Sequence, residues 1–115
     1  MNEVRRRVSE FNRIAAAWLE QLPKHSRGAE IGVWKGDFTQ LIYDIVQPTE
    51  LHLVDPWEFQ PDFAHCMYGG KVAKSQADMN MIHAHVMTRF EAHKPQVHRC
   101  YSSSALDEIE DESLD

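Results

Sequence analysis

The sequence predicts an α/β fold in which a sheet of three parallel strands is covered by helices. Two observations lead to this prediction. Short apolar runs alternate three times with segments of helical periodicity, and strands that are joined through helices become parallel neighbours by right-handed crossovers. Of the 115 residues, 43% are hydrophobic and 26% are charged, which is typical of a globular domain.

The N-terminal segment is expected to form a helix from about residue 3 to residue 22. Its apolar residues recur at steps of three and four, which places them in one stripe, and Pro23 marks the end of the helix. We therefore divide the chain into an N-terminal helical extension, residues 1–26, and a domain formed by residues 27–115. The stripe consists of Val4, Val8, Phe11, Ile14, Ala15, Trp18, Leu19 and Leu22.

The first strand is expected at residues 29–33, a short and mostly apolar run bounded by glycine. Asp37 and Gln40 resemble a capping box at the start of the next helix. Pro48 ends that helix, because proline cannot continue the helical hydrogen bonds.

The second strand is expected at residues 50–55. The segment 56–74 that follows is rich in aromatic residues, proline and glycine, and its length is typical of a functional loop. Ser75 is expected to cap the third helix, and the third strand is expected at residues 96–101. A short helical turn then begins at Ser104.

The charge and composition exclude several classes of partner. The formal net charge is −6, whereas a nucleic-acid surface needs clustered positive charge. The one basic run, Arg5 to Arg7, is interpreted as the solvated face of the first helix. No apolar run approaches the length that spans a membrane, and two cysteines do not form a disulfide framework. We therefore expect a soluble protein of the cytoplasm that binds neither nucleic acid nor a membrane.

Seven histidines raise the question of a metal site. His83 and His85 are two residues apart on a helix and therefore point to different faces. His65 and Cys66 are adjacent in a loop, with no second pair at the spacing of zinc ligands. We therefore expect no metal site, and we interpret Cys100 as a small core residue in the third strand.

A ligand site is expected where the first two strands end. Parallel sheets bind ligands beyond the carboxyl ends of their strands. Gly32 and Gly36 allow the backbone to approach a ligand closely, and Asp55 follows Glu30 at about the separation at which an acidic residue meets the hydroxyls of a ribose. The alternative interpretation is a tight turn without a ligand.

The charges around this loop favour a ligand without phosphate. The glycine spacing, Gly28, Gly32 and Gly36, does not match the G-x-G-x-x-G pattern of dinucleotide sites. Asp37 occupies the helix start that a phosphate would need, and Glu30 adds negative charge. S-adenosylmethionine, with ribose hydroxyls and cationic amino and sulfonium groups, suits this environment better.

Three stretches of the sequence resemble class I S-adenosylmethionine-dependent methyltransferases. Ala29–Thr39 is similar to their motif I, of the form E-x-G-x-x-x-G, and Leu51–Trp57 to their motif II. The run Asp55–Pro61, with Met67–Gly70 after it, resembles the small-molecule type grouped as methyltransferase domain 24. The resemblance extends over most of the chain from about residue 27.

The resemblance implies a Rossmann-like three-layer sandwich with strand order 3-2-1, the first part of a seven-stranded sheet. It places Asp55 at the ribose hydroxyls, and it leaves two alternatives for Trp57, packing against adenine or anchoring a loop. Glu30, Gly32 and Gly36 would line the methionine end, and Ser102 and Ser103 would lie near the adenine edge.

The implied function is methyl transfer from S-adenosylmethionine to a small-molecule acceptor. Family members place acceptor-binding and catalytic groups at and after a fourth strand, so we name no catalytic residue. Two alternatives remain: a non-catalytic module that binds the nucleoside or packs against a partner, and, less favoured, an NAD-dependent oxidoreductase. The exposed edge of the first strand also predicts self-association.

Overall fold

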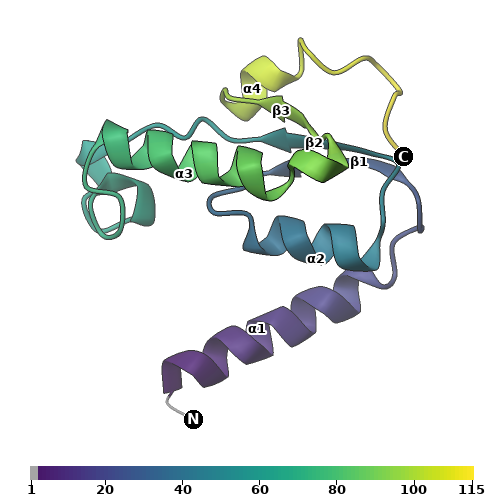
Figure 1. The fold of residues 1–115 in the computed structure, drawn as a ribbon, viewed down its shortest axis with the longest axis horizontal. Coiled ribbons are helices and arrows are strands. Elements are labelled where there is room, and N and C mark those ends of the chain that lie inside the picture. The colour runs from purple at the N-terminus through teal and green to yellow at the C-terminus, as the bar shows by residue number, and fades with distance from the viewer. Residues whose placement is uncertain (1–2) are drawn as a thin grey trace.

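The computed structural model describes residues 3–115, with side chains from residue 10 onward, and it has the expected α/β architecture. A three-stranded parallel sheet is surrounded by helices, an arrangement compatible with a Rossmann-like fold (Figure 1). The main elements are α1 (Glu3–Leu19), β1 (Arg27–Ile31), α2 (Asp37–Ile45), β2 (Glu50–Val54), α3 (Gln76–Arg89), β3 (Gln96–His98) and α4 (Ser102–Ala105). Three short 3-10 helices, η1 (Pro61–Phe63), η2 (Met67–Gly69) and η3 (Glu91–His93), lie in the connections.

The sheet has the strand order β1-β2-β3, with both neighbouring pairs parallel. Ile31 of β1 pairs with Val54 of β2, and Val54 pairs with His98 of β3. The carboxyl ends of the three strands are therefore level, so the residues that follow them meet at one edge of the sheet. In Figure 1, α2 lies between α1 and the sheet, and α4 lies on the opposite side.

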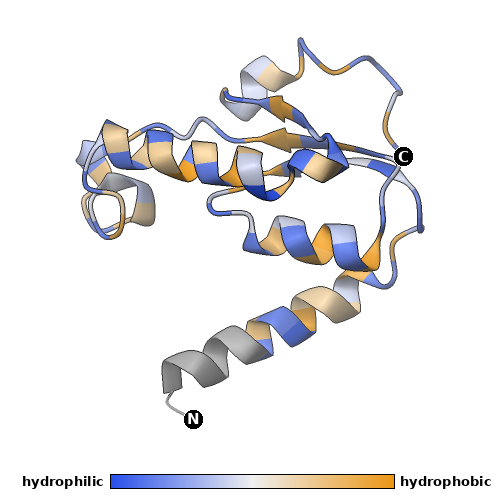
Figure 2. Ribbon diagram, viewed as in Figure 1, coloured by the Kyte–Doolittle hydropathy of each residue, from blue (hydrophilic) through white to orange (hydrophobic). Residues whose placement is uncertain are grey.

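The hydrophobic core lies between the sheet and helices α2 and α3. Alternate residues of a strand point to opposite faces, and Leu51 and Leu53 of β2 are buried together with side chains of both helices. Figure 2 shows hydrophobic segments interrupted by hydrophilic ones in the strands and a mixed pattern along the helices. The helices and their ends contribute Leu19, Ile42, Tyr43, Val46, Met79, Val86 and Phe90 to this core.

The boundaries of two strands differ from the prediction. β1 begins at Arg27 and ends at Ile31, so that Val33 lies in the following loop. β3 ends at His98, because the N–H of Cys100 turns back to the carbonyl of His98 at 3.0 Å. Cys100 is therefore not a core residue of a strand, and that prediction was wrong. Its half-buried thiol donates a hydrogen bond to Glu108 Oε2 at 3.3 Å.

The first helix is confirmed, but only part of its apolar stripe is buried. Ala15 and Leu19 are buried, whereas Phe11, Ile14 and Trp18 are each more than half exposed. Val4 and Val8 lie outside the residues whose side chains the structure describes. No helix in the described part of the chain is both long and apolar enough to cross a membrane.

Of the three helix starts expected at Asp37, Ser75 and Ser104, one has the predicted cap, and α4 begins at Ser102, two residues before the expected start. Ser75 caps α3, since its hydroxyl accepts a hydrogen bond from the N–H of Asp78 at 3.2 Å. The start of α2 differs, because the cap position is taken by Gly36 and Asp37 instead pairs with Arg89 at 2.9 Å.

Candidate functional site

The loop between β1 and α2 turns two backbone N–H groups toward one point. Three of its residues have left-handed backbone conformations: Gly32 (φ 87°), Trp34 (φ 57°) and Gly36 (φ 89°). The N–H groups of Val33 and Trp34 donate to Asp55 Oδ2 at 2.9 and 3.0 Å. Successive N–H groups arranged in this way form a small anion-binding concavity. In this chain its anion is the carboxylate at the end of β2.

Asp55 receives two further hydrogen bonds. Its Oδ1 accepts from the N–H of Trp57 at 2.7 Å, and its Oδ2 also accepts from the hydroxyl of Tyr68. The residue is only 1% exposed. Asp55 therefore joins the glycine loop, the start of the 56–74 segment and the helix η2.

A pocket of about 280 Å³ opens beyond the carboxyl ends of the strands. The structure brings three residues predicted for the site together here: Gly32, Asp55 and Ser102. The remaining lining comes from Ile31, Val54, Pro56, Gln60, Tyr68, Cys100 and Tyr101. The pocket adjoins a second one of about 380 Å³, with which it shares Pro56, Cys100 and Tyr101.

Gly36 and Ser103 do not line the pocket beside Asp55. Gly36 is buried against α3, where an added Cβ would lie 2.6 Å from the Phe90 ring. The absence of a side chain at Gly36 allows the start of α2 to lie against Phe90 at the end of α3. Ser103 is exposed on α4, next to Ser102.

Trp57 has the contacts of a loop anchor. Its ring is fully buried, its Nε1 donates to the carbonyl of Trp34 at 3.0 Å, and it packs on His83 with ring centroids 4.9 Å apart. The carbonyl of Trp57 accepts a hydrogen bond from Gln76 at 3.0 Å. Of the two alternatives for this residue, the geometry therefore favours the anchor, since a stacking partner for adenine needs an exposed ring face.

The side chain of Glu30 points from β1 toward α2. It is buried, and its carboxylate accepts a hydrogen bond from the hydroxyl of Thr39. Burial raises the pKa of Glu30 to about 7; the Thr39 hydrogen bond opposes the rise, and the charge of Asp55 adds to it. Glu30 is therefore partly neutral at pH 7, and it contributes less negative charge to the site than the sequence suggested.

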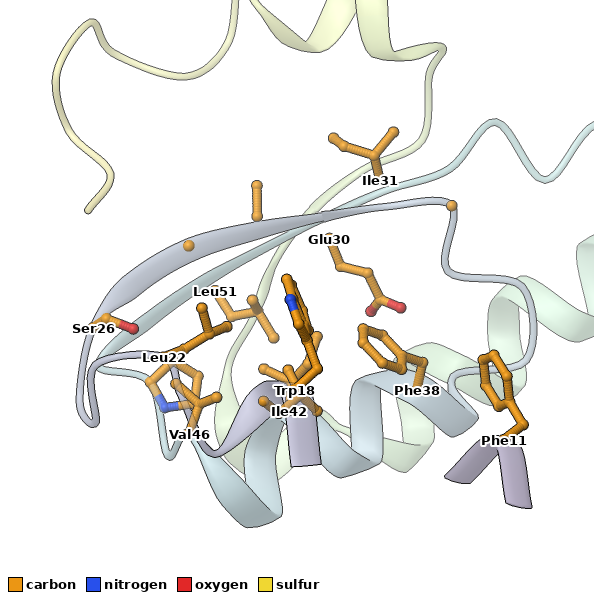
Figure 3. A pocket seen from close by; sticks show the side chains of 15 residues that line it. Phe11, Trp18, Leu22, Ser26, Glu30, Ile31, Phe38, Ile42, Val46 and Leu51 are labelled. Carbon is orange, nitrogen blue, oxygen red and sulfur yellow. The ribbon is translucent and has the colours of Figure 1, made fainter. Parts of the chain in front are cut away.

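Glu30 also lines a pocket of about 490 Å³ between α1, α2 and β1. Figure 3 shows its carboxyl group directed toward Phe38, with Trp18 beside it. The other lining residues are uncharged, so the pocket is an apolar groove along β1. It meets the pocket beside Asp55 at Ile31 and Gly32.

The sequence did not indicate the roles of Tyr68 and Tyr101. Both line the Asp55 pocket, and the hydroxyl of Tyr101 donates to Glu58. The sequence drew attention to Tyr68 only through its position beside two glycines in the long aromatic segment, in the run Met67–Gly70 that carries part of the resemblance, and it assigned the residue no role. Tyr68 and Asp55 are thirteen residues apart in the sequence, and most of the backbone between them is irregular. Hydrophobic periodicity therefore gives no sign that the two residues are in contact.

The histidines form one close pair, on the sheet face opposite α2. His52 Nδ1 and His98 Nε2 lie 2.8 Å apart, and both rings are buried. Glu50 and Glu108 approach the two rings at 3.5 and 3.4 Å. Among the side chains that the structure describes, those of residues 10–115, no three histidine, cysteine or acidic groups lie together so that they would hold a metal ion.

No family model matches this chain, and no curated protein or solved structure matches it. Its function must therefore be inferred from the geometry of the site.

Proposed function

We propose that this chain binds S-adenosylmethionine and forms the cofactor-binding part of a methyltransferase that acts on a small-molecule acceptor. One observation carries the proposal. Gly32, Asp55 and Ser102 surround a single pocket beyond the carboxyl ends of parallel strands, where open α/β sheets bind their ligands. We further propose that the three strands belong to the Rossmann-like, seven-stranded sheet of class I methyltransferases.

The N–H groups of the glycine loop are already hydrogen-bonded within the chain, and this favours a ligand without phosphate. In a dinucleotide site the free N–H groups of this loop bind the pyrophosphate. Here the N–H groups of Val33 and Trp34 already donate to Asp55. A phosphate would have to displace this buried carboxylate and would meet its negative charge. This argument disfavours an NAD-dependent oxidoreductase.

We assign the three parts of the proposed ligand to three neighbouring regions of the site. The space beside Asp55 suits the ribose, and the neighbouring pocket next to Trp57 and Tyr101 suits the adenine. The methionine end would extend over Gly32 toward Glu30. Methyl transfer needs the donor and acceptor held close and in line in a site that excludes water, and this chain would supply the donor's half of that arrangement.

The experiment that tests the proposal compares two neighbouring serines. Ser102→Tyr would fill the pocket, whereas Ser103→Tyr changes an exposed residue that does not line it. Calorimetric titration should show that S-adenosylmethionine and S-adenosylhomocysteine bind the wild type. Ser102→Tyr should weaken binding by about tenfold or more, and Ser103→Tyr should leave it unchanged. Binding of NAD alone, or equal losses in both variants, would contradict the proposal.

Asp55 is unsuitable for this first test, although it is the proposed ribose ligand. Its replacement would leave the N–H groups of Val33, Trp34 and Trp57 without their buried partner. Such groups cost free energy when they stay unpaired. Lost binding in an Asp55 variant would therefore not separate a binding role from a structural one.

A second function, as an interaction module, is favoured by the surface along β1. The apolar groove at this edge includes Trp18 and Phe11, which are 55% and 62% exposed, and Ile31, which points to the other face of β1 (Figure 3), is 61% exposed. Contiguous apolar surface of this kind marks sites of protein association. We propose self-association through this edge as the alternative.

A further inference from the structure

The hydroxyl of Tyr68 occupies an acceptor position on Asp55 that a ligand needs. Tyr68 lies on η2, in the middle of the 56–74 segment, and its hydroxyl donates to Asp55 Oδ2. Burial and the neighbouring carboxylate of Asp55 raise the pKa of Tyr68 above its usual range. The phenol therefore keeps its proton and remains a hydrogen-bond donor at neutral pH.

Tyr68 differs from the other three donors to Asp55. Those donors are backbone N–H groups of Val33, Trp34 and Trp57, which stay in place as long as the two loops keep their conformation. Among the described side chains, those from residue 10 onward, Tyr68 supplies the one donor to this carboxylate. A side chain can leave without breaking the backbone around the site.

The two oxygens of Asp55 are unequally occupied. Oδ2 accepts from Val33, Trp34 and Tyr68, whereas Oδ1 accepts from Trp57 alone. A ribose carries two neighbouring hydroxyls, and one carboxylate can accept hydrogen bonds from both. One hydroxyl would use the free position on Oδ1, and the other would take the place of the Tyr68 hydroxyl.

The segment that carries Tyr68 is only lightly attached to the rest of the molecule. Residues 61–67 are all exposed, and the Tyr68 ring contacts Trp34 with ring centroids 4.7 Å apart. Within the segment the packing is tight, since a Cβ on Gly69 would lie 2.0 Å from the carbonyl oxygen of Phe63. Helices η1 and η2 are therefore suited to move together. Surface segments with few buried contacts open at low free-energy cost.

We propose that Tyr68 is a latch that closes the nucleoside site in the unliganded chain, and that the ribose hydroxyls of the ligand displace it. This inference rests on the proposed function, because it takes Asp55 as the ribose ligand. The latch keeps the carboxylate paired before the ligand arrives. It also lowers the affinity for the nucleoside, because binding must first release Tyr68.

The test uses Tyr68→Phe, which removes the hydroxyl and keeps the ring on Trp34. The matched control is Tyr43→Phe, whose buried hydroxyl makes no hydrogen bond in the structure. We expect Tyr68→Phe to bind S-adenosylhomocysteine about tenfold more tightly than the wild type, since a hydrogen bond to a charged group no longer competes. Tyr43→Phe should bind with wild-type affinity.

Hydrogen exchange provides a second measurement that does not depend on affinity. The N–H groups of Cys66 and Gly69 are bonded within the segment, to Phe63 and Cys66. Without ligand, these groups should exchange faster in Tyr68→Phe than in the wild type or Tyr43→Phe. Addition of S-adenosylhomocysteine should shift the wild-type exchange toward that of Tyr68→Phe.

The possible results separate the two proposals. Equal or weaker binding by Tyr68→Phe, or unchanged exchange in the segment, would overturn the latch while leaving the proposed function in place. Absence of binding by all three proteins would overturn the proposed function and the latch together. Tighter binding with faster exchange supports both.

Discussion

The carboxylate of Asp55 stabilises two unusual backbone conformations. Trp34 and Trp57 both have positive φ, at 57° and 41°, and neither is a glycine. Such conformations cost on the order of 1–3 kcal/mol each and persist where the surroundings hold them. Both residues donate their N–H to Asp55, at 3.0 and 2.7 Å. Strained backbone conformations are common at functional sites. Here the two strained residues are held by one buried carboxylate, which lines the candidate pocket.

The buried carboxyl group of Glu30 predicts an unusual dependence of stability on pH. Its pKa is raised from the ordinary value of 4.5 to about 7, chiefly by burial. At a pH between about 4.5 and 7, Glu30 is protonated in the folded chain and ionised in the unfolded chain. The contribution of Glu30 to the free energy of unfolding is therefore fully present below about pH 4.5, and it is lost as the pH rises through 7.

Glu30→Gln should remove this dependence, because the amide does not titrate and can still accept the hydrogen bond from Thr39. The stability of the variant relative to the wild type should rise by about 3 kcal/mol between pH 4.5 and pH 8.5. Urea unfolding at several pH values measures this difference. Glu20→Gln, at an exposed carboxylate, is the control. A difference that stays constant with pH would show that the Glu30 carboxyl is not buried as described.

At the scale of elements, the contact between the start of α2 and the end of α3 depends on a glycine. Gly36 has φ 89° and lies against the Phe90 ring, which is itself 1% exposed. Gly36→Ala should therefore destabilise the chain by about 3 kcal/mol, from the left-handed conformation and from the overpacked contact. Thermal or urea unfolding measures the loss.

Gly28→Ala is the matched control for this prediction. Gly28 lies in β1, and a Cβ there would meet nothing within 4 Å. We expect its effect to stay within about 0.5 kcal/mol. Equal effects of the two substitutions would mean that Gly36 does not limit the approach of the helices.

The elements differ in how well the sequence predicted them. The central strand was predicted within one residue, at 50–55 against Glu50–Val54, because its apolar run is buried and bounded on both sides. β1 was misplaced by two residues, since Val33 is apolar and buried although it lies in the loop. An apolar residue that fills the core from a loop cannot be distinguished from a strand residue by its hydropathy.

At the scale of the whole molecule, the sequence predicted the part of the site that depends on topology. Gly32 and Asp55 meet because parallel strands end at one edge of the sheet, and this follows from the order of the elements. Tyr68 and Tyr101 reach the same pocket through irregular backbone, for which neither periodicity nor spacing provides a rule. For Trp57 the sequence left two alternatives, and its contacts inside the molecule favour the loop anchor over packing against adenine.

The outer edge of β1 is the feature of the whole molecule that most favours association. Among residues 3–115, no strand pairs with this edge, and only Arg27 is bonded there, to Asp115. The N–H of Gly32 points to β2, and strand residues alternate in direction. The N–H and C=O groups of Ala29 and Ile31 therefore point outward, beside the apolar groove.

We predict that the 115-residue chain self-associates through this edge and that Ile31→Lys reduces the association. The Ile31 side chain is 61% exposed, and a charge on an edge strand opposes pairing with another strand. Sedimentation equilibrium over a range of concentrations measures the change.

Met81→Lys is the control, because Met81 is 72% exposed on α3, away from β1. A wild-type chain that stays monomeric at all concentrations, or equal effects of both lysines, would contradict association through β1. Because the two lysines add the same charge to equally apolar positions, a difference between them isolates the contribution of the strand edge from that of general surface hydrophobicity.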